Sequence, residues 1–359
     1  MVVGKKILGM GAAALGVSVL ALGGTGASAA APRATVTING AGSTFIAPLL
    51  QGQIIPGFTG ANSSVQVNYQ AIGSGAGISL FQKGNVDFAG SDALLKPSQE
   101  TIAKATCGGG AGGGVFKIPT TIGAVALIYN LPGVNTGLKL SPSVVAKIFL
   151  GQITNWNDAQ IARLNSSVRL PSVKIQTIHR ADGSGTTYIF TNYLKAVDTS
   201  WASQIGAGAT VAWPNGTGAP QSSGVSAAVG QTQGGVSYVD LAYAIKNHLN
   251  YARVQNSRGE FVAPGIASAS AAAASFASSI PSDLQQIIVN SKSSGAYPIT
   301  GYSYIFMCNR QSGTRGRTLV NFVRYAVTTG QAHAGLLYYA PLPKNVQSAD
   351  VAALNRIAR

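Results

Sequence analysis

The stretch His179–Tyr188, with the sequence HRADGSGTTY, combines a cation, a carboxylate and a turn rich in glycine and hydroxyl groups. Apolar runs at 175–178 and 186–194 flank it and predict a strand, a turn and a helix in that order. The first N–H groups of a helix lack intrahelical partners and lie at its positive end, so they can bind an anion. The guanidinium of Arg180 adds a planar fork of donors. The stretch therefore fits an anion site, although the same turn also fits an ordinary helix cap.

Three more segments place polar residues where a strand ends. GAGSTF at 40–45 and AIGSGAG at 71–77 each lie between a strand pattern and an apolar helix pattern, and VDFAGSD at 86–92 ends a short strand on Asp92. The first of these segments lacks the Lys of a P-loop and the spacing of a dinucleotide fingerprint. Ligands of open α/β sheets bind at the carboxyl ends of strands. We therefore expect these strand ends to meet at one site.

Strand and helix patterns alternate along the rest of the chain. Strands are predicted over residues 115–120, 124–130, 235–239 and 302–308, and helices over 97–105, 141–150, 159–164, 225–232, 241–247, 283–289, 314–328 and 349–357. The run at 268–276, rich in Ala and Ser, fits either a surface helix or a loop. This alternation is typical of βαβ units and predicts an α/β fold with a mostly parallel sheet. A length of 359 residues is enough for two lobes, each with its own core.

The chain is strongly basic because acidic residues are scarce. It has 25 Lys plus Arg and 10 Asp plus Glu, which gives a formal charge of +15. Apart from a cluster of four arginines at positions 310, 315, 317 and 324, the basic residues are dispersed. A nucleic-acid interface usually shows a denser stripe with interleaved aromatic residues. We therefore expect no nucleic-acid partner, and a diffuse positive field that attracts anions.

Residues 1–29 have the three parts of a secretory signal peptide. Lys5 and Lys6 precede an apolar run at 7–22, and Ala-Ser-Ala at 27–29 fits the cleavage pattern. The apolar run is too short and too rich in glycine to span a membrane well. No Cys lies near the cleavage site, so a lipoprotein is not expected. No later segment reaches a spanning length, and the sequence therefore predicts a soluble, exported, periplasmic protein.

Few residues here are typical of catalytic or metal centres. Cys107 and Cys308 can pair in an oxidising compartment or remain buried thiols, and without a nearby His they do not form a zinc site. The three histidines, at 179, 248 and 333, are scattered, and there is no G-x-S-x-G motif. His179 should point away from the turn, because side chains alternate along a strand. We expect a protein that is not an enzyme and has no metal or other cofactor.

Six segments also form a recognisable series. They are INGAGSTFIAPL at 38–49, YQAIGSGAG at 69–77, VDFAGSD at 86–92, IFLGQITNWND at 148–158, HRADGSGTTYIFTNYL at 179–194 and YPITGYSYIF at 297–306. From about residue 36 to the C-terminus the chain resembles the phosphate-binding proteins of bacterial phosphate ABC transporters. The resemblance implies a type II periplasmic binding protein fold, with two α/β lobes joined by hinge strands and the ligand in the cleft. It places one lobe at 36–116 plus 297–359 and the other at 117–296.

The resemblance also implies a set of phosphate-binding residues. They are Thr44, Phe45, Ser74, Asp92, Arg180, Ser184, Gly185 and Thr186. Asp182 corresponds to the residue that orients the arginine, and Phe45 would contribute its backbone N–H. Asp92 would accept a hydrogen bond from a protonated phosphate oxygen. Sulfate has no proton at neutral pH, so it would leave that contact unpaired and bind more weakly. Taken singly, Ser74 and Asp92 also fit helix caps, and Phe45 fits a core residue.

The expected function is therefore that of a receptor. A monomer would capture inorganic phosphate between its lobes and deliver it to the membrane permease and ATPase subunits of an ABC transporter. A receptor for another oxyanion, such as sulfate or molybdate, is an alternative, although Asp92 argues against it. A secreted phosphatase is a second alternative, and it would need a nucleophile with a base or a metal cluster.

Overall fold

A mixed β-sheet organises the computed structural model, which describes residues 35–108 and 114–357. The predicted signal peptide, residues 1–29, lies outside the described residues. The strands are β1 (Val36–Gly42), β2 (Val65–Ala71), β3 (Phe88–Ser91), β4 (Val115–Tyr129), β5 (Lys139–Leu140), β6 (Gln176–Arg180), β7 (Thr217–Ala219), β8 (Gly235–Asp240), β9 (Asn250–Tyr251), β10 (Arg253–Gln255), β11 (Phe261–Val262) and β12 (Thr300–Cys308). In the described part, the main sheet follows the order β2-β1-β3-β12-β4-β8-β6-β7, and β9 pairs with β4.

Helices lie between most of these strands. They are α1 (Ala47–Leu49), the π-helical turn η1 (Leu50–Ile54), α2 (Ile55–Ala61), α3 (Ser74–Gln82), α4 (Pro97–Thr106), α5 (Pro142–Phe149), α6 (Ala159–Leu164), α7 (Gly185–Val197), α8 (Thr199–Gln204), α9 (Gln221–Gln231), α10 (Leu241–Lys246), α11 (Ile266–Ala277), α12 (Gly313–Val327), the 3₁₀ helix η2 (Thr329–Leu337) and α13 (Lys344–Asn355). None of the helices in the described ranges has both the length and the apolar character to cross a membrane.

The direction of the strands differs between the flanks and the centre of the sheet. β1 is parallel to β2 and β3, and β6 is parallel to β7 and β8. β12 is antiparallel to β3 and β4, and β4 is antiparallel to β8. The prediction of a mostly parallel sheet is thus correct at the flanks and wrong at the centre. The local βαβ pattern does not reveal that β12, from the C-terminal part of the chain, inserts between β3 and β4.

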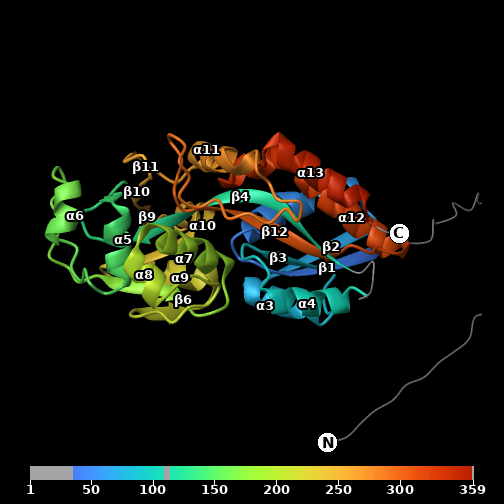
Figure 1. Cartoon of the computed structure of the whole chain (residues 1–359), viewed down its shortest axis with the longest axis horizontal. Helices are drawn as coiled ribbons and strands as arrows, with labels where there is room; N and C mark the ends of the chain where they lie inside the picture. Colours follow the sequence, from blue (N-terminus) through green and yellow to red (C-terminus); the bar gives the residue numbers. More distant parts are fainter. Residues whose placement is uncertain (1–34, 109–113, 358–359) are drawn as a thin grey trace, which may run out of the picture. The chain divides into compact units, whose positions relative to one another are not determined.

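β4 connects the two parts of the sheet (Figure 1). It is one continuous strand, where the sequence predicted two, because the residues around Gly123 also pair with β12. Up to Ala124 the strand pairs with β12, and from Val125 it pairs with β8. The division into two lobes at residues 116/117 and 296/297 stays a prediction.

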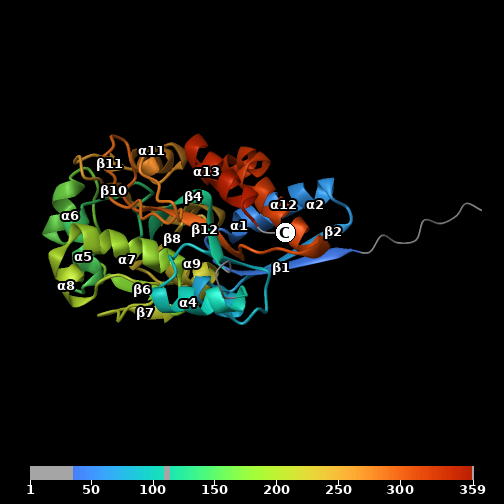
Figure 2. The ribbon, with the colours of Figure 1, turned by 45° about the vertical axis from the view of Figure 1, so that its right-hand side comes forward.

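Helices cover both faces of the sheet. In Figures 1 and 2, α3 and α4 lie on one side of β1, β2 and β3, and α12 and α13 lie on the other. Along β4, residues 125, 127 and 129 pack in one apolar cluster with side chains of α7, and Ala126 and Ile128 pack in another with side chains of α9. Since alternate side chains of a strand point to opposite faces, α7 and α9 cover opposite sides. This packing on β4 fixes the positions of α7 and α9, whose first residues lie at the candidate site.

Local signals account for most helix positions, with one clear failure. Ser141 caps α5 with Pro142 in its first turn, as predicted, and the run at 268–276 lies within α11. The predicted helix at 283–289 is wrong, because that segment has no helical residues. The side chain of Asp283 accepts the N–H of Gln285, and the hydroxyl of Tyr304 accepts the N–H of Gln286. These bonds replace those of a helix.

A disulfide bond joins Cys107, after α4, to Cys308, at the end of β12. The sequence left this pairing open. Because the two residues are 201 positions apart, the bond restricts a long loop of the unfolded chain. We predict that Cys107→Ser combined with Cys308→Ser lowers the free energy of unfolding by about 2–5 kcal/mol, measured by urea denaturation. Wild-type protein treated with a reductant should show the same loss, and an unchanged midpoint in both samples would contradict the prediction.

Asp350, on α13, is a fully buried carboxyl group. Neither of its oxygens has a hydrogen-bond partner among the described residues, and the nearby hydroxyl of Tyr302 also lacks one. Burial raises the pKa of Asp350 to about 9. The folded state therefore keeps a proton that the unfolded state releases above about pH 4, and stability falls as the pH rises from about 4 to 9.

We predict that Asp350→Asn, which cannot ionise, flattens this pH dependence. At pH 8 the variant should be more stable than the wild type by about 2 kcal/mol or more, and the difference should shrink toward pH 4. Thermal unfolding at a series of pH values measures this. Asp283→Asn is the control, because Asp283 is exposed and its pKa is lowered, so its loss should not flatten the fall in stability above pH 4. Parallel pH curves for the wild type and Asp350→Asn would contradict the prediction, because they would mean that Asp350 has the same pKa in the folded and unfolded states.

Candidate functional site

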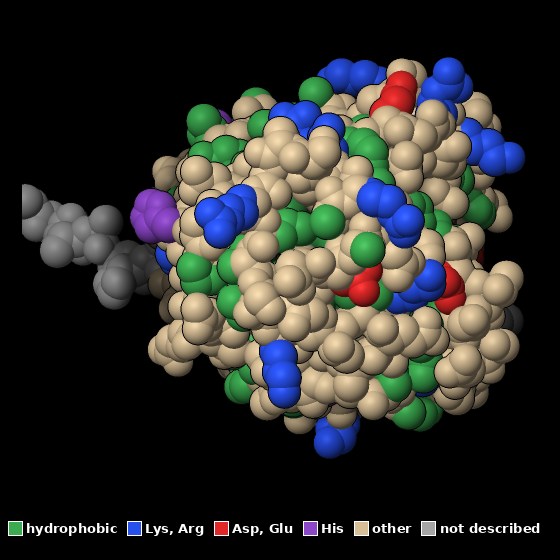
Figure 3. All heavy atoms as spheres, turned by 90° about the vertical axis from the view of Figure 1, so that its left-hand side faces the viewer, with side chains coloured by type: hydrophobic (Ala, Val, Ile, Leu, Met, Phe, Trp, Pro, Cys, Tyr) green, Lys and Arg blue, Asp and Glu red, His purple; other side chains and the backbone are tan. Residues whose placement is uncertain are grey.

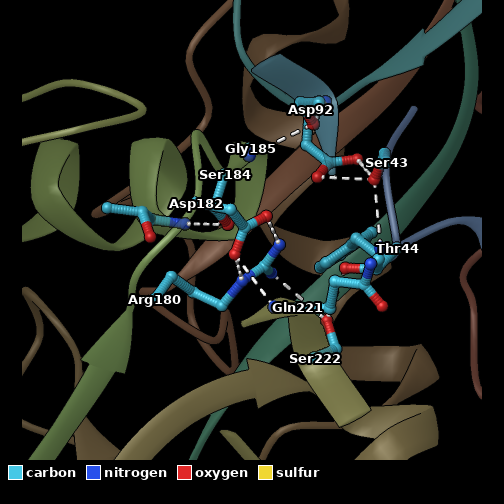
Figure 4. Close-up of polar contacts among 12 residues, drawn as sticks. Ser43, Thr44, Asp92, Arg180, Asp182, Ser184, Gly185, Gln221 and Ser222 are labelled. Carbon is cyan, nitrogen blue, oxygen red and sulfur yellow. Dashed lines mark hydrogen bonds and ion pairs between the residues drawn. The ribbon is translucent and has the colours of Figure 1, made fainter. Parts of the chain in front are cut away.

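The carboxyl ends of several strands meet at one place, with polar groups directly after them (Figure 4). From β1, β2 and β3 come the residues at 43–45, Ser74 and Asp92. From β6 and β7 come the residues at 180–186 and 221–222. This arrangement agrees with the expectation that the strand ends form one site.

Arg180 is the last residue of β6 and is only 4% exposed. Its Nε and Nη2 atoms donate to the two carboxylate oxygens of Asp182, at 2.8 and 2.6 Å. Nη1 donates to the Oγ of Ser222 at 3.4 Å, and the backbone N–H of Gln221 donates to Asp182 at 2.9 Å. A bidentate pair of this kind fixes the plane of the guanidinium. Asp182 is therefore placed to orient the guanidinium, and its role in a binding site stays a prediction.

Asp92, directly after β3, is buried and accepts hydrogen bonds from two serine hydroxyls. Ser43 donates to Oδ1 and Oδ2 at 2.7 and 2.8 Å, and Ser303 of β12 donates to Oδ1 at 2.6 Å. Lys96, not Asp92, is the residue before the first turn of α4, so Asp92 is not a helix cap. Its carboxylate faces the start of α7 instead.

The start of α7 contacts Asp92 closely because residue 185 is glycine. A Cβ atom built on Gly185 would lie 2.3 Å from Oδ2 of Asp92 and 2.6 Å from its backbone nitrogen, so no larger residue fits. Ser184 caps the helix by accepting the N–H of Thr187 at 3.1 Å. The hydroxyl of Thr186 is buried and has no hydrogen-bond partner among the described residues. The turn before α7 is thus a helix cap, which the sequence allowed, and the first turn of α7 also carries a buried hydroxyl group without a partner in the described part of the chain.

Hydrogen bonds join the residues of the two predicted lobes across this site. The N–H of Gly185 donates to Ser74 Oγ at 3.1 Å, and the N–H of Gly75 donates to the carbonyl of Gly183 at 2.8 Å. Ser74 is the first residue of α3 and makes no capping bond, so the cap interpretation is wrong for it. The hydroxyls of Thr44 and Ser222 lie 2.8 Å apart. These contacts hold the residues of the two predicted lobes together at the site.

Phe45 combines a buried ring with a backbone donor. Its ring is fully buried and packs edge-on against Tyr339 at 6.0 Å. Its N–H donates to the Oγ of Ser43 at 3.0 Å. The hydroxyl of Ser43 therefore accepts the N–H of Phe45 and donates to Asp92, so it links this turn to the carboxylate.

The electrostatics of the site depend on three carboxyl groups. Burial raises the pKa of Asp92 to about 6, although the hydrogen bonds of Ser303 and Ser43 and the charge of Arg180 oppose this. Burial also acts to raise the pKa of Asp182, but the hydrogen bonds and charge of Arg180 outweigh it and lower the pKa. Burial raises the pKa of Asp240, at the end of β8. Asp182 is thus the firmly ionised partner of the arginine.

The structure brings together every residue that the resemblance placed in the site. It also adds four that sequence reasoning missed: Ser43, Gln221, Ser222 and Ser303. Ser43 lies inside a motif already singled out, and Ser222 follows a short strand at the start of a helix, so both had a local signal. Ser303 also lies inside such a segment, at 297–306, but nothing in that segment indicated its contact with Asp92, because the contact depends on the pairing of β12 with β3.

The structure also shows where other residues that the sequence analysis discussed lie. His179 stacks on Trp213 at 4.9 Å, which confirms that it packs away from the turn. Among residues 35–108 and 114–357, no group of three His, Cys, Asp or Glu side chains is placed to hold a metal ion. On the face drawn in Figure 3, Lys and Arg side chains lie scattered and do not form a stripe.

Comparisons with known proteins agree with the fold and the motifs. Residues 27–329 match a family model described as a PBP superfamily domain. The chain is 38% identical over 314 residues to the phosphate-binding protein PstS of Xylella fastidiosa strain Temecula1, covering 87% of this chain and 83% of that one. It is 36% identical over 314 residues to the phosphate-binding protein PstS of Pasteurella multocida, covering 86% and 87%.

A solved structure has the same architecture. A phosphate-binding protein from Stenotrophomonas maltophilia superposes with a TM-score of 0.69 at 21% identity, covering 88% of this chain and 93% of that one. This likeness confirms the predicted α/β periplasmic binding protein fold. The sequence relatives confirm the family resemblance of the motifs.

The pairing of Arg180 with Asp182 predicts the effect of removing the carboxylate. Asp182→Ala leaves a buried guanidinium without its anion, and the free energy of unfolding should fall by about 3 kcal/mol, since Asp182 itself is partly exposed. An added oxyanion should restore part of this loss, because it binds the folded state beside the arginine. Urea denaturation with and without the oxyanion measures both effects. Asp283→Ala is the exposed control, and equal stability of the two variants would contradict the prediction.

Proposed function

Since the chain belongs to the PstS family of phosphate-binding proteins, within the PBP superfamily, we propose that it is a receptor for inorganic phosphate. One observation carries the proposal: a buried, oriented guanidinium, the start of α7 and an acceptor-only carboxylate converge at one point. An anion site needs the first two, and the third selects for an anion that carries a proton.

Each residue of the site has a separate role in this proposal. Arg180 binds phosphate oxygens through its guanidinium, and Ser184, Gly185 and Thr186 contribute hydroxyl and N–H donors at the positive end of α7. Thr44, Phe45 and Ser74 contribute donors from the opposite side. Several of these donors bond to one another here, as Thr44 does to Ser222 and Gly185 does to Ser74. Phosphate binding exchanges these internal bonds for bonds to its oxygens, at little net cost in hydrogen bonds.

Asp92 provides the selectivity. An ionised carboxylate cannot donate a hydrogen bond, so it repels a sulfate oxygen. It can accept a hydrogen bond from the O–H group of hydrogen phosphate. The cost of leaving such buried groups unpaired corresponds to a discrimination of about a hundredfold or more. The same reasoning disfavours molybdate and other oxyanions that lack a proton at neutral pH.

Entry of the ligand requires the two sides to separate. The bonds across the site join residues 43–92 to residues 180–222, and β4 and β12 connect the parts of the sheet that bear them. We assign these sides to two lobes, 36–116 plus 297–359 and 117–296, which open and close by a hinge. Closure buries the ligand, and its oxygens then take the hydrogen bonds that join the two sides here.

The protein acts as a monomeric receptor outside the cytoplasmic membrane in this proposal. Its signal peptide, residues 1–29, directs export to the periplasm, and the membrane permease and ATPase subunits of a phosphate ABC transporter receive the ligand. The site offers hydrogen-bond donors and an orienting carboxylate, which suit binding. A phosphatase would need a nucleophile with a base, and we give no residue of this site that role.

Calorimetric titration of the phosphate-free protein with phosphate and with sulfate tests the proposal. We expect one-to-one phosphate binding and at least about a hundredfold weaker sulfate binding at neutral pH. Asp92→Asn replaces the acceptor by an amide that can donate, so the ratio of the two affinities should fall at least about tenfold. Absence of phosphate binding would overturn the proposed function. Equal binding of both anions by the wild type would favour a general oxyanion receptor.

A further inference from the structure

Ser303 reaches Asp92 from a distant part of the chain. The two residues are 211 positions apart, and both side chains are buried. In the antiparallel pairing of β3 with β12, Tyr304 lies opposite Ser91, so the next pair along the strands is Ser303 and Asp92. The pairing of β12 with β4 shifts its register between Ser303 and Tyr304. Such a bulge changes the direction of neighbouring side chains and is common next to active sites.

We propose that Ser303 is a positioning residue of this site, which holds Asp92 as a hydrogen-bond acceptor and thereby sets the pH range over which the receptor distinguishes phosphate from sulfate. The proposal rests on the proposed function for the part that concerns selectivity. Its structural basis is the contact itself, a hydroxyl–carboxylate hydrogen bond of 2.6 Å. That length is typical of a strong bond to an ionised oxygen.

Ser303 is better suited to this role than Ser43. The Oγ of Ser43 donates to Asp92 but also accepts the N–H groups of Phe45 and Ile46, at 3.0 and 3.4 Å. Changing Ser43 would therefore disturb both the carboxylate and the turn that carries Thr44. The hydroxyl of Ser303 donates to Asp92 Oδ1, and its backbone belongs to a central strand. Removal of this hydroxyl changes the environment of Asp92 with little effect on the turn.

Ionisable groups from every neighbouring element bear on Asp92. Arg180, at the end of β6, favours its ionised form. Asp240, at the end of β8, has an electrostatic interaction with Asp92 that disfavours a second charge. Tyr69 of β2 and Tyr339 also interact with it, and burial raises the pKa of both tyrosines, so they stay neutral near pH 7. The hydroxyls of Ser303 and Ser43 are the hydrogen-bond donors that oppose the effect of burial.

The chemical consequence follows from the two protonation states of Asp92. The ionised carboxylate accepts a hydrogen bond from the O–H group of hydrogen phosphate and repels sulfate. The protonated form carries an O–H group that can donate to sulfate, so selectivity is lost at low pH. Ser303 favours the ionised form, because a hydrogen bond to a charged oxygen is stronger than one to a neutral oxygen. Without it, selectivity should be lost at a higher pH.

Two measurements on Ser303→Ala test this in the mature chain. Carbon NMR of the ligand-free protein follows the Asp92 carboxyl group, with Asp92→Asn to assign its signal, and its midpoint should rise by about one pH unit. Calorimetry with sulfate from pH 5 to 8 should show the onset of sulfate binding shifted upward by the same interval. Ser237→Ala is the matched control, because Ser237 is equally buried but donates to the carbonyl of Ile178.

Further variants separate this role from a general loss of structure. Ser303→Cys is nearly isosteric and a weaker donor, so it should give a smaller upward shift and serves if Ser303→Ala does not fold. In the Asp92→Asn background, Ser303→Ala should leave the sulfate profile unchanged, since the titrating group is gone.

The outcomes also distinguish this proposal from the proposed function. A wild-type protein that binds phosphate, with Ser303 variants that keep the wild-type Asp92 midpoint and sulfate profile, overturns the role of Ser303 alone. A pH shift of equal size in Ser237→Ala also overturns it. A wild-type protein that does not bind phosphate overturns the proposed function, and the carboxyl titration then still decides whether Ser303 controls the ionisation of Asp92.

Discussion

A buried guanidinium must have an anion beside it, and the arrangement of the site follows from that requirement. Arg180 is almost inaccessible to solvent, and removing a full charge from water is costly unless it is paired and hydrogen-bonded. Asp182 meets the requirement from the same turn, which leaves one edge of the guanidinium directed at Ser222. The fold thus keeps a positive group buried in a site otherwise built of neutral donors.

Glycine makes the close approach of the two sides possible. The contact of Gly185 with Asp92 and of Gly75 with Gly183 leaves no room for a Cβ atom without displacement of backbone or carboxylate atoms. Gly73, just before α3, adopts a φ of 94°, which favours glycine, and a Cβ there would lie 2.3 Å from Asp182. The starts of α3 and α7 can therefore lie in contact, and hydrogen bonds from Gly75 to Gly183 and from Gly185 to Ser74 join them.

The sequence predicted contacts between residues close together in the chain, and it missed contacts between residues far apart in the chain. Arg180, Asp182 and Ser184 were readable because strand, turn and helix follow one another within ten residues. The pairing of Asp92 with Ser303 was not readable, because it depends on β12 lying between β3 and β4. The same non-local pairing joins the two predicted strands of β4 into one. It also replaces the helix expected at 283–289, where Tyr304 of β12 accepts a backbone N–H.

In the proposed site, the antiparallel centre of the sheet contributes differently from the parallel flanks. The flanks supply donors through strand-to-helix turns, and each turn is a local structure. The centre supplies Ser303, which β12 places beside Asp92 directly after β3. A paired strand holds a side chain more firmly than a loop does. A site that must reject a close isostere depends more on the exact protonation and position of one acceptor than on the number of donors. The position of Asp92 beside β12 would meet this demand in the proposed receptor.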